Sequence, residues 1–285
     1  MIMKKILITG GNGQLAYELV RLAQEKKYLF SAPTRNELDI TQPLAIQQVL
    51  DHFQPDVVIN AAAYTQVDQA EKEPEKAYTV NSEGAKNIAV ACASHQIPLL
   101  HLSTDYVFSG QQTRPYLESD VVSPINVYGA SKWQGEEAVR VYCPQHIILR
   151  VSSVFGRHGQ NFVKTILRLA REKKIIRVVA DQTMCPTPAK AIADALLYIM
   201  TMPQWGTYHY CSTEAVTWYD FAVAITQQAK QSIQIDPVTT ADYPTAAKRP
   251  AYAVLNNSLF EKTFAIKCPD WRIGLKDVIT TLSTS

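Results

Sequence analysis

The sequence predicts a doubly wound α/β fold, in which helices cover both faces of a parallel sheet. Short runs of apolar and β-branched residues alternate with helical patterns through the first half of the chain, which is typical of parallel strands joined by helical crossovers. A glycine-rich turn links the first run to the first helix. With 285 residues, the chain can also bury one large core, or a large domain with a smaller partner. A ligand is expected beyond the carboxyl ends of the strands.

Five strands and four helices alternate in order along this first half. The apolar runs at 5–9, 29–32, 57–61, 99–103 and 147–151 are expected as strands. Apolar residues at helical spacing lie between them, at 15–26, 44–53, 74–95 and 128–142. The crossovers that connect such parallel strands should be right-handed.

The pattern loosens after Val151 into separate helical stretches at 162–173, 189–201 and 218–231. The proline-bearing segments 236–250 and 267–270 indicate loops rather than a linker between independent domains. We therefore expect a nucleotide-binding domain at 1–150. Residues 151–285 would then form mainly a smaller, C-terminal substrate-binding domain, partly interleaved with the first.

Composition favours small-molecule chemistry over macromolecular binding. The chain is 47% hydrophobic and 19% charged, with 28 basic and 26 acidic residues. A balance so near neutrality gives no electrostatic case for nucleic acid or for an anionic membrane surface. No stretch approaches the length of a transmembrane span, and the apolar run at 6–8 is too short for a signal peptide.

The cysteines and histidines point to a reducing compartment without a catalytic metal. The five cysteines are widely spaced and contain no C-x-x-C pair, which predicts a cytoplasmic protein. The six histidines are scattered and match no metal-ligand spacing. We expect no metal.

The turn T-G-G-N-G-Q-L-A, at 9–16, predicts a dinucleotide site. It follows a strand and opens a helix, so its backbone N–H groups can approach a pyrophosphate at the helix N-terminus. Its spacing is Gly10-x-x-Gly13-x-x-Ala16 rather than G-x-G-x-x-G, and a tight turn that merely opens a helix is the alternative. The cofactor contacts predicted in this turn are Gly10, Asn12, Gly13, Gln14 and Leu15.

The residues at the end of the second strand indicate whether NAD or NADP is preferred. An acid directly after that strand would select the ribose hydroxyl of NAD, whereas Arg35 can pair with the 2′-phosphate of NADP. NADPH is therefore favoured, and NADH stays an alternative.

The stretch V-Y-G-A-S-K contains Tyr128 and Lys132, four positions apart. On a helix these side chains lie on one face and can converge on one point. A nearby cation favours the phenolate and moves the pKa of a tyrosine toward the range of a general acid. The spacing also arises by chance on amphipathic helices, so its neighbours must decide.

Several further segments resemble the dTDP-4-dehydrorhamnose reductase family, in the extended short-chain dehydrogenase/reductase superfamily of Rossmann-fold enzymes. They are N-A-A-A-Y-T-Q-V-D-Q-A-E at 60–71, S-T-D-Y-V-F-S-G at 103–110, V-Y-G-A-S-K at 127–132, F-G-R-H-G-Q-N-F-V at 155–163 and R-P-A-Y-A-V-L at 249–255. The resemblance covers nearly the whole chain, in the right order. It implies NADPH-dependent reduction of the 4-keto group of a dTDP-6-deoxysugar to dTDP-L-rhamnose.

The resemblance also implies roles for matched positions. Tyr128 would protonate the forming alkoxide, Lys132 would lower the pKa of Tyr128 and hold the nicotinamide ribose, and Thr104 would hydrogen-bond the keto oxygen. Further cofactor contacts would come from Asp39, Ile40, Ala62, Ala63, Thr65 and Tyr106. The substrate side would include Asp105, Ser153, Asn161 and Arg249.

Departures from the family pattern leave alternatives open. Ser153 stands where these reductases usually carry tryptophan, which favours a related 4-keto deoxysugar of the dihydrostreptose type as an alternative substrate. A non-catalytic regulatory subunit with the same cofactor cleft is a second alternative, and the complete Thr104, Tyr128 and Lys132 set argues against it. A nucleotide-sugar 4,6-dehydratase or epimerase on the same fold is a third alternative, but the dehydratases carry a carboxylate where this chain has Tyr106, and a neutral phenol is a poor base near neutral pH. Lys190 argues against a metal-bridged dimer, and a homodimer of another kind is the assembly to test.

Overall fold

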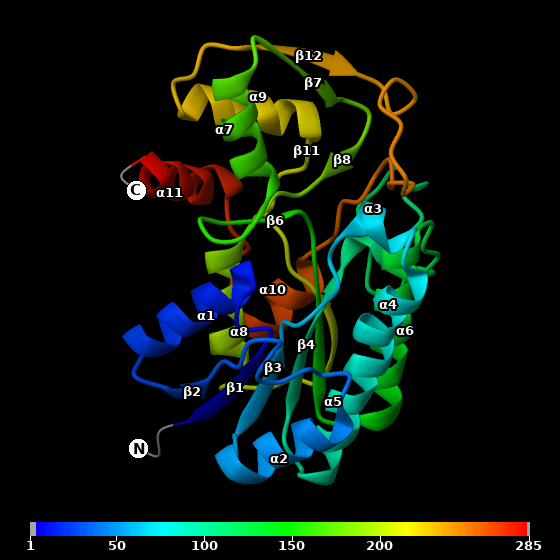
Figure 1. Cartoon of the computed structure of the whole chain (residues 1–285), viewed down its shortest axis with the longest axis vertical. Coiled ribbons are helices and arrows are strands. Elements are labelled where there is room, and N and C mark those ends of the chain that lie inside the picture. Colours follow the sequence, from blue (N-terminus) through cyan, green and yellow to red (C-terminus); the bar gives the residue numbers. More distant parts are fainter. Residues whose placement is uncertain (1–3, 284–285) are drawn as a thin grey trace.

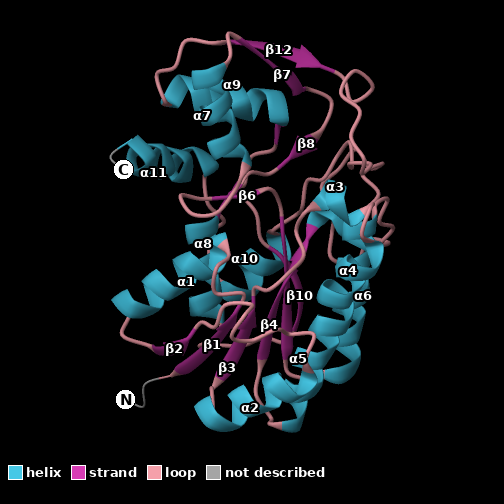
Figure 2. Ribbon diagram, in the orientation of Figure 1, coloured by secondary structure: helices cyan, strands magenta, loops and turns pink. Residues whose placement is uncertain are grey.

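Buried apolar strands align side by side as one parallel sheet at the centre of the computed structural model, which describes residues 4–283 (Figure 1). Its order is β10-β5-β4-β3-β1-β2. The strands are β1 (Lys5–Thr9), β2 (Leu29–Ser31), β3 (Val57–Asn60), β4 (Leu99–Thr104), β5 (His146–Val151) and β10 (Gly206–His209). All neighbouring pairs run parallel, and helices lie on both faces (Figure 2). The predicted fold class is confirmed.

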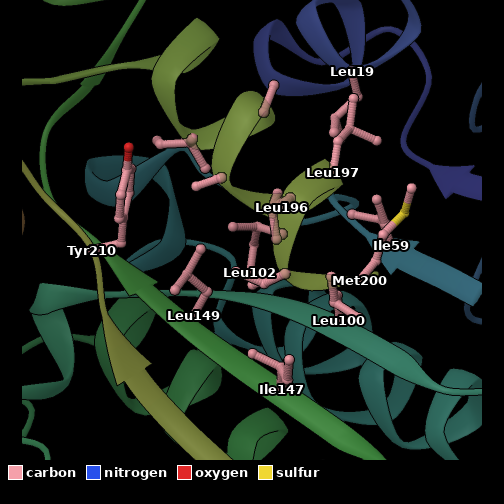
Figure 3. Close-up of a cluster of buried hydrophobic side chains, with 14 of the residues drawn as sticks. Leu19, Ile59, Leu100, Leu102, Ile147, Leu149, Leu196, Leu197, Met200 and Tyr210 are labelled. Atoms are coloured by element: carbon pink, nitrogen blue, oxygen red, sulfur yellow. The ribbon is translucent and has the colours of Figure 1, made fainter. Parts of the chain in front are cut away.

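One face of the sheet is covered by helices from both halves of the chain. They are α1 (Gln14–Glu25), α8 (Ala189–Ile199) and α10 (Ser258–Phe264). Figure 3 shows Leu196 and Leu197 of α8 packed over the sheet residues Ile59, Leu100 and Leu149. The stretch 189–201, expected in the substrate half, is therefore part of the sheet's helical layer, because its apolar residues complete this core.

The opposite face carries α2 (Pro43–Phe53), α5 (Gly84–Ser94) and α6 (Val127–Tyr142). The helix expected at 74–95 forms as one continuous run, made of α4 (Pro74–Tyr78), a π-helical turn η1 (Thr79–Glu83) and α5, and the short helix α3 (Val67–Ala70) precedes it. Close packing against α6 accounts for this turn: an added Cβ at Gly135 would lie 2.1 Å from Asn81 O. Asn81 Nδ2 also donates to Ser131 Oγ at 3.0 Å.

A smaller lobe holds a separate core beyond the carboxyl ends of the strands (Figure 1). Its helices are α7 (Phe162–Glu172), α9 (Trp218–Gln228) and α11 (Trp271–Ser283). Three two-stranded sheets accompany these helices. They are β6 (Val154–Phe155) with β9 (Thr187–Pro188), β7 (Ile175–Val179) with β12 (Gln234–Val238), and β8 (Thr183–Met184) with β11 (Val216–Thr217). The sequence predicts a loop at 236–250, but the first residues of this segment belong to β12 and pair with β7. Within residues 4–283, no helix is both long and apolar enough to cross a membrane.

Candidate active site

The residues predicted to carry chemistry come from five elements and lie at one edge of the sheet. The glycine turn follows β1, Ala62 and Ala63 follow β3, and Thr104 ends β4. Ser153 follows β5, and Tyr128 opens α6. Because all these strands are parallel, their carboxyl ends meet at the same edge, where open α/β sheets bind ligands.

The glycine turn has the backbone that a pyrophosphate requires. Gly10 has φ +72°, and an added Cβ would lie 2.8 Å from Ala62 Cα, so no side chain fits there. Helix α1 begins with Gly13 as its N-cap, without a side-chain cap and without an acidic residue in its first turn. Its first N–H groups therefore remain available to an anion. These residues fit the phosphates of a dinucleotide.

The loop after β2 presents a cation at the surface. The Arg35 side chain is 63% exposed, and its Nε lies 3.5 Å from Asp39 Oδ2. Asp39 Oδ1 also accepts the N–H of Thr41 at 3.0 Å. Ile40 is buried in the core that includes α2 and α5, whereas Thr65, after β3, is exposed. Arg35 is thus free to turn from a weak surface pair to a phosphate.

Tyr128 is brought to the end of β4 by a close helix approach. Asn126 caps α6 by accepting the N–H of Gly129 at 2.7 Å. An added Cβ at Gly129 would lie 2.1 Å from Tyr106 O, so glycine lets α6 touch the short helix η2 (Asp105–Val107). The rings of Tyr106 and Tyr128 meet edge to face at 5.8 Å. Burial raises the pKa of Tyr128 to about 12, a hydrogen bond with Thr104 lowers it, and the Asp105 charge raises it.

Lys132 is held against the sheet rather than against the phenol. Its Nζ donates to Leu102 O at 2.6 Å, and the side chain is buried. Burial lowers the pKa of Lys132 to about 8, and the Glu136 carboxylate opposes this shift. Burial, the Thr104 hydrogen bond and the Asp105 charge set the pKa of Tyr128 here, and the expectation that Lys132 lowers it stays a prediction.

Asp105 points inward, where neutral groups surround it. Its Oδ1 accepts from Thr104 Oγ1 at 2.9 Å, and its Oδ2 accepts from Ser152 Oγ at 2.7 Å. Burial raises the pKa of Asp105 to about 6, although the hydrogen bonds from Ser152 and Thr104 lower it. The Asp105 carboxyl group, predicted to contact the substrate, forms its hydrogen bonds in this structure with Thr104 and Ser152.

Behind these residues lies an ionic cluster that the sequence patterns did not indicate. Glu136, fully buried, accepts from Arg150 Nη2 at 2.7 Å, from Arg140 Nη2 at 2.7 Å and from Ser103 Oγ at 2.5 Å. Ser103 precedes Thr104, and Glu136 lies one turn after Lys132. The cluster therefore ties β4, β5 and α6 together just below the predicted site.

The remaining substrate candidates have structural partners. Asn161 caps α7 by accepting from Lys164 N at 3.2 Å, and its Nδ2 donates to Gly156 O at 2.7 Å. Arg249 donates to both oxygens of Asp68, at 3.0 and 2.6 Å. Ser153 has φ +44°, a conformation that non-glycine residues rarely adopt. Of the three, Ser153 stands directly after the sheet edge.

Metal ligands do not gather here. Residues 4–283 contain no group of three or more His, Cys, Asp or Glu side chains arranged to hold an ion. Lys190 pairs with Asp194 at 3.0 Å.

A doubly wound sheet with Thr104, Tyr128 and Lys132 at its carboxyl edge defines a short-chain dehydrogenase/reductase of the extended type. The chain belongs to the dTDP-4-dehydrorhamnose reductase family, and the model described as RmlD substrate binding domain matches residues 3–284. This confirms the resemblance seen in its motifs.

Individual relatives are similar to this chain over nearly its full length. The chain is 43% identical to a dTDP-4-dehydrorhamnose reductase of Aggregatibacter actinomycetemcomitans, over 97% of this chain and 98% of the relative. A crystal structure of such a reductase from Clostridium acetobutylicum aligns with TM-score 0.95 and 37% identity, covering 98% and 99% of the two chains. Another, from Bacillus anthracis in complex with NADP, aligns with TM-score 0.95 and 36% identity, covering 98% and 100%.

Proposed function

We propose that this protein is an NADPH-dependent oxidoreductase that reduces the 4-keto group of dTDP-4-dehydro-L-rhamnose to give dTDP-L-rhamnose. The observation that carries the proposal is that Thr104 ends β4 and bonds Tyr128 at the start of α6, with Lys132 one turn further on, at the same sheet edge where α1 opens with an uncapped N-terminus. The named relatives support the sugar, and the neighbour solved with NADP supports the cofactor. Such a product supplies deoxysugar for surface polysaccharide.

Proton donation falls to Tyr128 in this proposal. NADPH, when bound, supplies the hydride that reaches the carbonyl carbon. Negative charge then develops on the carbonyl oxygen and needs a proton there. The raised pKa of Tyr128, about 12, keeps its phenol protonated at neutral pH. An alkoxide is a stronger base than a phenolate, so transfer from Tyr128 to the substrate oxygen is favourable.

The other residues bind and orient. Lys132, fixed by the Leu102 carbonyl, would hold the nicotinamide ribose. Gly10, Asn12, Gly13, Gln14 and Leu15 would cradle the phosphates, with Ala62, Ala63 and Thr65 beside them. Thr104 would face the keto oxygen, and Tyr106 would border the nicotinamide or the sugar. Asn161 and Arg249 would act from the substrate side, each from a position fixed by its structural partners.

Arg35 should set the preference for NADPH. We expect Arg35→Ala to lower kcat/KM with NADPH by about tenfold to a hundredfold, because a charged hydrogen bond to a phosphate is lost. The value with NADH should change little. Steady-state kinetics with both cofactors measure this, and Arg168→Ala, which removes an exposed arginine of α7, is the matched control. An equal loss with both cofactors would contradict the assignment.

The function itself is tested with one assay. Purified protein is mixed with dTDP-4-dehydro-L-rhamnose, the absorbance of NADPH is followed, and the sugar product is identified. We expect NADPH oxidation with dTDP-L-rhamnose formed. Oxidation only with a related 4-keto sugar would favour the dihydrostreptose-type alternative that Ser153 raises. Tight cofactor binding without oxidation of any such sugar would favour the regulatory subunit.

The proposal extends to the cellular compartment and the oligomeric state of the protein. All five cysteines are buried and unpaired, which supports the reducing cytoplasm as the site of action. A homodimer is the assembly we propose, and the molar mass of the purified protein by light scattering tests it.

A further inference from the structure

Thr104 has one hydroxyl proton, and three groups compete for its Oγ1: the Asp105 carboxyl, the main-chain N–H of Tyr106 and the phenol of Tyr128, which also forms a hydrogen bond with Thr104. Thr104 Oγ1 lies 2.9 Å from Asp105 Oδ1 and accepts the N–H of Tyr106 at 3.2 Å. A hydroxyl group donates once. An ionised carboxylate only accepts, so beside an ionised Asp105 the proton of Thr104 is used and none is left for a substrate carbonyl.

The surroundings of Asp105 disfavour its charge. The residue is 2% exposed. Besides burial, the largest influences on the pKa of its carboxyl come from neutral donors: the Ser152 and Thr104 hydroxyls and the main-chain amides of Asp105 and Tyr106. A buried anion without a cationic partner is costly.

Among residues 4–283, the nearby cations Lys132 and Arg249 have other partners. From η2 and α6 the phenols of Tyr106 and Tyr128 face it, and its charge acts on both. Lys132 of α6 is engaged by Leu102 O. Arg249 is paired with Asp68 and acts on Tyr106. Beyond Ser152 lies the main chain of Cys185, whose N–H reaches the Ser152 hydroxyl at 3.4 Å.

We propose that Asp105 is a positioning residue that works as a neutral carboxylic acid: its O–H donates a hydrogen bond to Thr104 Oγ1, and the Thr104 hydroxyl then donates its own hydrogen bond to the substrate's carbonyl oxygen. This rests on the proposed function. It reconciles the contacts of Thr104 with its expected place at the keto oxygen. It also removes a negative charge that opposes formation of the Tyr128 phenolate.

Burial already moves Asp105 in the required direction, raising its pKa to about 6. The phosphates of a dinucleotide and of a nucleotide sugar add negative charge nearby, and like charge favours the neutral acid further. We therefore expect the hydride-transfer rate to fall by up to tenfold per pH unit above the pKa that Asp105 has in the complex.

The first test compares pH profiles. Single-turnover loss of NADPH absorbance is recorded between about pH 5 and about pH 9 for wild type, Asp105→Asn and the exposed control Asp51→Asn. An amide donates more weakly than an acid, so the maximal rate of Asp105→Asn should fall by up to about tenfold, and its alkaline decline should vanish. Asp51→Asn should keep the wild-type profile. A loss of about a hundredfold or more at every pH, with NADPH binding intact, would mean that the carboxylate form acts and would overturn the proposal.

A second variant tests the direction of the pH effect while leaving the Asp105 carboxyl in place. Ser152→Ala removes a donor that favours the ionised form, so the alkaline decline should move up by about one pH unit. A downward move would overturn the proposal.

A third measurement needs no turnover. The Asp105 carboxyl is followed by ¹³C NMR in protein bound to NADP⁺ and dTDP, with Asp105→Asn giving the assignment. A carboxyl still protonated above about pH 6 supports the proposal, and one already ionised at about pH 5 refutes it. A wild type that leaves NADPH unoxidised refutes the proposed function, whereas this titration still decides the state of Asp105.

Discussion

Tyr128→Phe is expected to lower turnover by about a thousandfold or more while NADPH binding stays within about twofold of wild type. General acid catalysis typically contributes a hundredfold to ten-thousandfold, and phenylalanine keeps the ring but carries no proton to donate. The ring of Tyr128 also contacts Tyr106 edge to face, and this contact survives the change. Single-turnover rates with dTDP-4-dehydro-L-rhamnose, together with cofactor titration by fluorescence, separate chemistry from binding.

Tyr142→Phe is the matched control for that experiment. Tyr142 ends the same helix and is exposed, so its loss of a hydroxyl should leave the rate unchanged. If Tyr128→Phe kept more than about a tenth of wild-type turnover, another group would supply the proton, and the role given to Tyr128 would be wrong.

Arg150→Met is expected to lower the free energy of unfolding by about 3 kcal/mol or more. Removing one partner of a buried ion pair leaves the other charge uncompensated, which typically costs about 3–5 kcal/mol. Glu136 would keep its bonds to Arg140 and Ser103, so the lower end of that range applies. Urea unfolding at neutral pH measures the change.

A double variant and an exposed ion pair serve as controls for this measurement. The double variant Glu136→Leu, Arg150→Met removes both charges. Its free energy of unfolding should fall by less than that of Arg150→Met alone. Arg168→Met breaks an exposed pair with Glu172 and should cost less than about 1 kcal/mol. A double variant that lost as much as the sum of the two single changes would show that the buried charges do not depend on each other.

The parts of the molecule that were predictable from sequence are those encoded by neighbouring residues. Apolar runs located β1 and β3–β5 to within two residues, because burial on both faces demands such runs. The glycine turn and the Tyr128 to Lys132 spacing are likewise local. The matched motifs supplied the family, which the relatives confirm.

What escaped prediction depends on contacts between distant segments. Strand β10 has few apolar residues and exists because it pairs with β5. The π-helical turn depends on Gly135 of α6, and β12 depends on β7. The bonds of Glu136 to Arg150 and of Arg249 to Asp68 join positions that no spacing rule relates. The inward orientation of Asp105 depends in the same way on Ser152.

The return of the chain to its first sheet also has a consequence for synthesis on the ribosome. The last strand, β10, and the helix α10 that packs on it through Phe260 and Tyr208 come from the final third of the sequence. A nascent chain that ends before them carries a sheet with an unpaired edge at β5 and an uncovered patch of apolar side chains. Such surfaces bind other chains readily. The half that carries the six-stranded sheet, although first in sequence, can therefore be completed only near the end of translation.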